Sequence, residues 1–275
     1  MKLSINKYSS SILPFWGRGL VTFAVLLLSS FFVLKKEKPT LFLIGDSTVR
    51  NGTYGRGDGG LWGWGSFLHL FLDTDKISIQ NRALGGTSSH SYAEMGLWDK
   101  VLADIKPGDY VLMQFGHNDN GKNAIRNNSE DTLHYINPKT GKEEVVHSYG
   151  WNMRRYIREA KAKGAIPVVL SLVPRNLWTN GKINRSTNDF VLWAHQAADQ
   201  EGALFIDLNG IIADRYDADG ETKVRATYFN TSDHTHTIEA GAKVNAACVT
   251  KGLETLEGKL FTDYINQQAV KEYGE

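Results

Sequence analysis

The chain has 275 residues, of which 41% are hydrophobic and 22% are charged, with a formal net charge of +1. These values are typical of one globular domain with a large core, and the near-neutral charge argues against nucleic acid as a partner. The single cysteine, Cys248, excludes an intramolecular disulfide and a cysteine-rich zinc site, and its small-residue surroundings predict that it is buried.

A charge-free apolar run at residues 19–34 dominates the N-terminal part of the chain, and basic residues precede and follow it. The run is shorter than the roughly 20 residues of a transmembrane helix and long for the core of a signal peptide. We expect residues 1–39 to be a signal peptide or a membrane anchor, with tethering through residues 19–34 in the second case. The protein would then be exported, as a secreted, periplasmic or outward-facing anchored protein, and residues 40–275 would form one domain.

From residue 40 onward, predicted strands alternate with predicted helices. Short apolar or β-branched runs predict five strands, at residues 40–45, 76–83, 109–116, 166–174 and 203–208. Apolar residues at helical spacing predict helices at residues 64–72, 91–105, 149–164, 187–202 and 237–256. This alternation indicates right-handed βαβ units, and therefore a three-layer α/β/α fold of flavodoxin-like type with a parallel five-stranded sheet.

Two polar segments fall outside this alternation. Residues 120–147 carry many turn signals, and we expect either an insertion that binds substrate or a surface loop. Residues 217–221 (DADGE) resemble the start of a calcium loop, but Tyr228 stands where such a loop needs its final glutamate. We expect a tight turn between short extended segments there instead.

Polar residues follow three of the predicted strands and precede the last predicted helix. The first strand ends in Gly-Asp-Ser-Thr (45–48), the second is followed by Gly85 and Gly86, and the third ends in Gly-His-Asn-Asp (116–119). Asp-His-Thr-His (233–236) comes directly before the last helix. Because sites in open parallel sheets gather at the carboxyl ends of strands, we expect these residues to form one cluster.

Such a cluster has the residues needed to hydrolyse an ester. A serine nucleophile needs a base within hydrogen-bond reach, and the base needs an acid that fixes its tautomer. Ser47 can be the nucleophile, His236 the base, and Asp233, three residues earlier, the acid. The backbone amides of Ser47 and Gly86 and the side-chain amide of Asn118 can form the oxyanion hole.

Each of these features also has an ordinary structural explanation when taken alone. A serine after a strand is commonly part of a turn, paired glycines permit turns, and Asn-Asp often begins one. Asp233 and His234, close to a helix start, would also suit helix capping and pairing with the helix dipole. The joint occurrence of these features at strand ends favours the functional interpretation.

Several nearby side chains remain to be assigned. His234 is adjacent to Asp233 and does not fit the three-residue spacing, so we expect a supporting or surface role for it. Using His234 and His236 as a metal pair would leave the serine and the oxyanion donors unexplained, so no metal is expected. His117, Trp62 and Trp64 are candidate substrate contacts, although backbone hydrogen bonding explains the histidine equally well and core packing explains at least one tryptophan better.

The same motifs resemble a known family. GDST, the second glycine of ALGGTSS, GHND and DHTH resemble blocks I, II, III and V of the SGNH (GDSL-like) hydrolases, in order, between residue 40 and about residue 250. The longer stretches QFGHND and DHTHTIEAGAKVNA resemble rhamnogalacturonan acetylesterases and related carbohydrate esterases. One departure is Thr87, which stands where many of these relatives have arginine.

The resemblance implies a serine esterase that removes acetyl groups from a polysaccharide through an acetyl-enzyme, with rhamnogalacturonan or another pectic polymer as the expected substrate. It implies the roles already given to Ser47, Gly86, Asn118, Asp233 and His236, and neither a metal nor an organic cofactor. Two alternatives stay open. The same residues could act on another ester, such as acetylated xylan, a lipid or a thioester, or the chain could be a carbohydrate-binding protein without catalytic activity.

Overall fold

The computed structural model describes residues 37–50, 58–138, 140–186 and 189–274. The predicted signal peptide or anchor lies almost entirely outside these residues, so it stays a prediction. None of the helices in these ranges combines the length and the apolar character needed to cross a membrane. Residues Lys38–Glu275 cluster into one unit, whose architecture follows.

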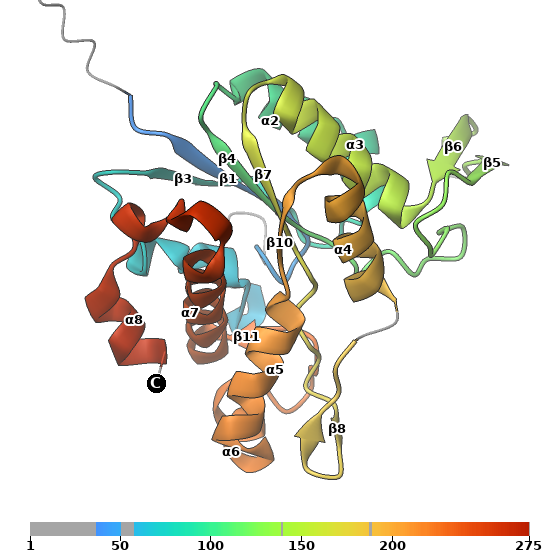
Figure 1. The fold of residues 1–275 in the computed structure, drawn as a ribbon. Coiled ribbons are helices and arrows are strands. Elements are labelled where there is room, and N and C mark those ends of the chain that lie inside the picture. Colours follow the sequence, from blue (N-terminus) through green and yellow to red (C-terminus); the bar gives the residue numbers. More distant parts are fainter. Residues whose placement is uncertain (1–36, 51–57, 139, 187–188, 275) are drawn as a thin grey trace, which may run out of the picture. The chain divides into compact units, whose positions relative to one another are not determined.

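A parallel sheet of five strands forms the centre of this unit (Figure 1). Its strands are β1 (Thr40–Gly45), β3 (Ser78–Asn81), β4 (Tyr110–Gln114), β7 (Ile166–Leu170) and β10 (Leu204–Ile206). They lie in the order β3-β1-β4-β7-β10, and every neighbouring pair is parallel. Counted along the chain this order is 2-1-3-4-5, which is the flavodoxin-like arrangement, so the predicted fold and all five strands are confirmed.

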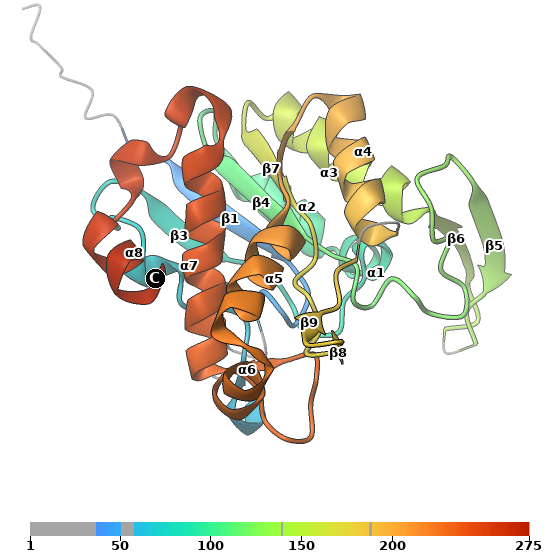
Figure 2. The ribbon, with the colours of Figure 1, turned by 60° about the horizontal axis from the view of Figure 1, so that its bottom comes forward.

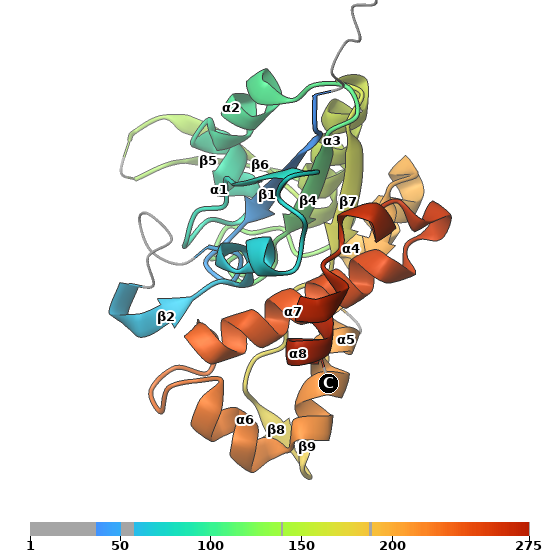
Figure 3. The same cartoon turned by 90° about the vertical axis from the view of Figure 1, so that its left-hand side faces the viewer.

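Helices cover both faces of the sheet (Figure 3). Leu41 and Leu43 of β1 point into one core, while Phe42 and Ile44 point into the other, because side chains alternate along a strand. The second core packs against α1 (Ser89–Glu94), α2 (Leu97–Asp104), α3 (Tyr149–Ala162) and α4 (Phe190–Glu201). The first packs against α5 (Leu208–Asp219), α6 (Glu221–Thr227), α7 (Glu239–Thr255) and α8 (Gln267–Gly274).

Some local predictions were wrong. Residues 91–105 form two helices, α1 and α2, because Gly96 between them adopts a left-handed conformation with φ of 66°. Residues 64–72 form two short 3₁₀ turns, Trp64–Ser66 and Leu68–Leu70, instead of one helix. Residues 217–221 do not join extended segments: they end α5 and begin α6, with Gly220 between the helices at φ of 84°.

The polar segment at 120–147 is neither a plain loop nor part of the main sheet. It holds an antiparallel hairpin of β5 (Thr132–Ile136) and β6 (Glu143–His147), which projects beyond α3 and α4 (Figure 2). Two further small sheets pair β2 (Leu61–Trp62) with β11 (Thr237–Ile238) and β8 (Trp178–Thr179) with β9 (Lys182–Ile183). The remaining short 3₁₀ turns are Asp58–Gly60, Glu257–Lys259 and Thr262–Tyr264.

Candidate active site

A tight turn at the carboxyl end of β1 holds Ser47. The strand can approach its neighbour only because residue 45 is glycine: a Cβ there would lie 2.4 Å from the Gln114 carbonyl oxygen. After it, the buried Asp46 carboxylate accepts hydrogen bonds from the amide and the hydroxyl of Thr48, at 2.9 and 2.7 Å. The backbone of the turn is therefore fixed on both sides of Ser47, whose side chain is largely buried.

Ser47, His236 and Asp233 form a continuous hydrogen-bonded chain, as the sequence predicted. The Ser47 Oγ lies 2.8 Å from His236 Nε2, and His236 Nδ1 lies 2.7 Å from Asp233 Oδ2. The other oxygen of Asp233 accepts the backbone amides of Thr235 and His236, at 2.7 and 2.9 Å. An ionised Asp233 would hold the proton of the ring on Nδ1, which leaves Nε2 free to accept the proton of Ser47.

The surroundings of Asp233 favour its ionised form. Burial acts to raise the pKa of this carboxyl, but hydrogen bonds from the amide and ring of His236 and from the amide of Thr235 outweigh burial and lower it. The histidine itself is positioned by its neighbour Thr237, which starts β11, pairs with Trp62 of β2 and donates a hydrogen bond of 3.0 Å to the Trp62 carbonyl.

The predicted oxyanion-hole residues lie in two neighbouring loops. Asn118 Nδ2 donates to the Thr87 carbonyl at 3.0 Å, which ties the loop after β4 to the loop after β3 and leaves its second N–H available. Gly86 has φ of 80°, and a Cβ there would meet nothing within 4 Å. The glycine is therefore required by its backbone conformation, whereas it is Gly85 that lies against Ser47, with a Cβ position 3.5 Å from the serine Cβ.

Thr87, which stands where many of the esterases that the sequence resembles have arginine, is buried. Its hydroxyl lies 2.8 Å from the Leu84 carbonyl and 3.3 Å from the Gly45 carbonyl, so this side chain fastens the loop after β3 to the end of β1. A residue of this size stays within the protein, so no side chain from position 87 extends toward a substrate.

The two tryptophans differ in their surroundings. Trp64 is only 1% exposed, and its Nε1 donates to Gln114 Oε1 at 2.8 Å. Gln114 in turn donates to the Thr48 hydroxyl, so Trp64 supports the turn of Ser47 from within the core. The prediction that Trp64 contacts substrate was therefore wrong, because its ring is enclosed by protein. Trp62 is half-buried and packs against the ring of Phe67, and its contact with substrate stays a prediction.

His117 and Asp119 are buried on either side of Asn118. The His117 Nδ1 lies 3.8 Å from Asp46 Oδ2, and neither ring nitrogen makes a hydrogen bond of normal geometry to a described residue. Burial lowers the pKa of His117 and outweighs the Asp46 carboxylate, which acts to raise it; Arg175 also disfavours protonation, so the ring is expected to be neutral. Asp119 accepts the amide and hydroxyl of Ser89, and burial raises its pKa to about 7.

The remaining polar candidates have structural positions. His234 is exposed, and its carbonyl accepts the Asn176 amide at 2.7 Å, in agreement with a surface role. Cys248 is buried, as predicted, and burial raises the pKa of its thiol to about 12. Within the described ranges, no three His, Cys, Asp or Glu side chains are placed to hold a metal ion.

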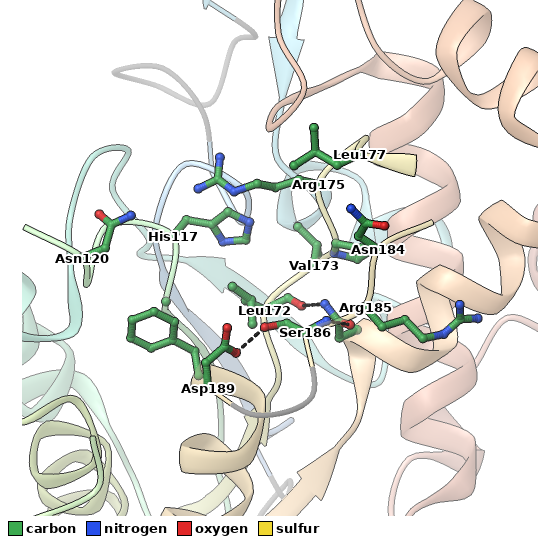
Figure 4. Close-up of a pocket in the computed structure, with 14 residues that line it drawn as sticks. His117, Asn120, Leu172, Val173, Arg175, Leu177, Asn184, Arg185, Ser186 and Asp189 are labelled. Carbon is green, nitrogen blue, oxygen red and sulfur yellow. Dashed lines mark hydrogen bonds between the residues drawn. The ribbon is translucent and has the colours of Figure 1, made fainter. Parts of the chain in front are cut away.

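A cleft of about 450 Å³ adjoins the loops that carry Asn118 and His236 (Figure 4). Its walls come from the segments that follow β4 and β7 and from the start of α4, and His117 and Arg175 lie at one end of it. The sequence interpretation missed Arg175. It follows the fourth predicted strand, so the rule about carboxyl ends of strands could have identified it.

Known proteins resemble this chain in sequence and in fold. Residues 43–244 match the GDSL-like lipase/acylhydrolase family. The chain is 34% identical over 220 residues to the "probable rhamnogalacturonan acetylesterase YesY" of Bacillus subtilis, covering 78% of this chain and 93% of the relative. It is 31% identical over 224 residues to the rhamnogalacturonan acetylesterase of Emericella nidulans, covering 78% and 84%. The crystal structure of protein YxiM from B. subtilis superposes with a TM-score of 0.65 at 26% identity, covering 79% of this chain and 56% of that one. The chain thus spans only about half the length of YxiM.

Proposed function

This chain belongs to the GDSL-like lipase/acylhydrolase family of ester hydrolases, and on that premise we propose that it is a serine carbohydrate esterase that removes O-acetyl groups from a polysaccharide. The hydrogen-bonded chain from Ser47 through His236 to Asp233 is the observation that carries the proposal. The nucleophile lies 2.8 Å from the base, and the base lies 2.7 Å from the orienting acid, as acyl transfer through a covalent intermediate requires.

The proposed reaction proceeds in two halves. The Ser47 oxygen attacks the acetyl carbonyl carbon while its proton passes to His236 Nε2, and the oxyanion is stabilised by the amides of Ser47 and Gly86 and the side chain of Asn118. The tetrahedral intermediate collapses, His236 gives its proton to the departing sugar oxygen, and an acetyl group remains on Ser47. Water then attacks the acetyl group with His236 as base, and acetate leaves. Asp233 stabilises the imidazolium of each half without taking its proton.

The expected substrate is acetylated rhamnogalacturonan. Its support is that two relatives above 30% identity are named a probable rhamnogalacturonan acetylesterase and a rhamnogalacturonan acetylesterase, and both are covered over most of their length. Acetylated xylan, a lipid ester and a thioester are the competing substrates for the same residues. A polymeric substrate would also suit the proposed export through the N-terminal segment, since a polysaccharide is degraded outside the cell.

Acetate release tests both parts of the proposal. The wild-type protein and Ser47→Ala would be incubated with acetylated rhamnogalacturonan, acetylated xylan and 4-nitrophenyl esters of increasing chain length. We expect acetate from rhamnogalacturonan, a preference for acetyl over longer acyl groups, and loss of activity in the variant. Activity that rises with chain length would refute the carbohydrate substrate and retain the esterase. Binding of acetylated oligosaccharide without turnover would support the non-catalytic alternative.

A further inference from the structure

The cleft beside the active site has an apolar floor, with Arg175 at one end and Asp189 at the other (Figure 4). Leu172 and Val173 lie at the floor, Asn120 and Asn184 stand at its sides (Figure 4), and Phe190 also lines the cleft. Its volume of about 450 Å³ falls within the roughly 300–1,000 Å³ of sites that hold small ligands. An apolar floor with amide groups around it suits a sugar ring, whose faces are apolar and whose edge carries hydroxyl groups.

Arg175 connects this cleft to the proposed catalytic residues. Its side chain is half-buried, and its Nη1 donates to the hydroxyl of Thr235, the residue directly before His236. In Figure 4 the guanidinium lies beside the ring of His117 at one end of the cleft, and Asp189 lies at the other end. A group bound by Arg175 would therefore lie beside the loop that carries His236.

Arg175 is also the cation of this cleft that lacks a carboxylate partner among the residues the structure describes. Arg185, which lines the same cleft, is paired with Asp214 at 2.6 Å and Asp217 at 2.8 Å. The Asp189 carboxylate accepts the Ser186 hydroxyl instead of an arginine. Since the neighbouring His117 is expected to be neutral, the charge at this end of the cleft comes from Arg175.

We infer that Arg175 binds the carboxylate of a uronic acid residue next to the acetylated position, and so makes the enzyme selective for acidic polysaccharides. This inference rests on the function proposed above. A guanidinium with one N–H committed to Thr235 keeps four donors, enough for a two-point contact with a carboxylate. A neutral polymer would cover the half-buried guanidinium without pairing it, and covering an unpaired charged group costs binding free energy.

A pair of substrates that differ only in charge tests the inference. Acetylated rhamnogalacturonan would be compared with the same polymer after reduction of its carboxyl groups to alcohols, with kcat/KM measured from acetate release. We expect the wild-type protein to prefer the acidic polymer, with a preference that declines as salt is added. In Arg175→Gln the ratio of the two kcat/KM values should fall about 10-fold or more, chiefly through a higher KM for the acidic polymer.

Arg185→Gln is the matched control, because it removes the same group from the same cleft where that group is already paired, and its ratio should remain that of the wild type. Arg175→Lys keeps the charge without the planar fork, and its ratio of kcat/KM values should fall between those of the wild type and Arg175→Gln.

An equal loss on both polymers in Arg175→Gln would overturn the inference and assign Arg175 to positioning the His236 loop through Thr235. A wild-type protein that hydrolyses both polymers equally, at any salt concentration, would overturn it without use of a variant and would leave the esterase proposal standing. No acetate release from either polymer or from nitrophenyl acetate would overturn both.

Discussion

Replacing Asp233 by asparagine should damage catalysis far more than a loss of charge at this partly exposed site would suggest. The two carboxylate oxygens face different partners: Oδ1 accepts two backbone amides at 2.7 and 2.9 Å, and Oδ2 accepts the His236 ring N–H at 2.7 Å. An asparagine can present its oxygen to only one side. With its oxygen toward the backbone, the asparagine would accept two hydrogen bonds from amides, whereas with its oxygen toward the ring it would accept one. The first orientation is therefore favoured by about 1 kcal/mol.

That orientation turns the asparagine NH₂ toward His236 Nδ1, which must then lack a proton. The ring would carry its proton on Nε2 and would donate to Ser47 instead of accepting from it. The same change in the serine protease triad lowers kcat by about 10⁴, and we expect a loss of roughly 10³–10⁴ here, equivalent to about 4–5.5 kcal/mol in the barrier.

The assay is steady-state hydrolysis of 4-nitrophenyl acetate at neutral pH, with kcat and KM determined separately. We expect kcat to fall and KM to change little, since Asp233 does not contact the proposed acetyl site. Thermal unfolding of Asp233→Asn would verify that the fold is intact. A loss of less than 10-fold in a folded variant would refute the tautomer argument and the assignment of His236 as the base.

Three further predictions concern single residues. Asn118→Ala should raise the barrier by about 2.7–4 kcal/mol if its amide is an oxyanion donor, measured as kcat on nitrophenyl acetate, and wild-type kcat would remove it from the site. The folded-state pKa of Asp119 is raised from 3.8 to about 7. Ionising Asp119 therefore lowers the free energy of unfolding: the loss is absent below about pH 4 and reaches its full size above about pH 7. The Tm of wild type relative to Asp119→Asn should therefore decline as pH rises through this window, and a constant difference would contradict the burial argument. Trp64→Phe leaves the buried oxygen of Gln114 without its donor and should destabilise the protein by about 1–3 kcal/mol in denaturant unfolding, whereas a raised KM at unchanged stability would return Trp64 to the substrate site.

The main sheet and the proximity of Ser47, His236 and Asp233 could be predicted because both follow from strong local signals. Most of the strands are short apolar runs, and the ends of parallel strands share one edge, which places the Ser47 turn beside the loop of Asn118. The depth of an aromatic side chain has no such signal, so Trp64 could not be distinguished from a surface tryptophan before its partner Gln114 was known.

Breaks in helices and contacts between loops were harder to predict. The predicted helix at residues 91–105 ran through Gly96, whose left-handed conformation separates α1 from α2. Gly220 ends one unpredicted helix and precedes another, and turn residues alone do not reveal whether helices or strands flank them. The position of Arg175 after the fourth predicted strand made it a candidate, but only the folded structure shows that no described carboxylate pairs with it.

Covalent acetylation of Ser47 is the step on which the proposed mechanism depends. The most direct measurement is rapid acid quenching of the enzyme during the first turnover of 4-nitrophenyl acetate, followed by peptide mass spectrometry. We predict a burst of nitrophenol equal to the enzyme concentration and an acetyl group on Ser47, with neither in Ser47→Ala. Hydrolysis that continues in Ser47→Ala, or an acetyl group located on a different residue, would contradict the assignment of Ser47 as the nucleophile.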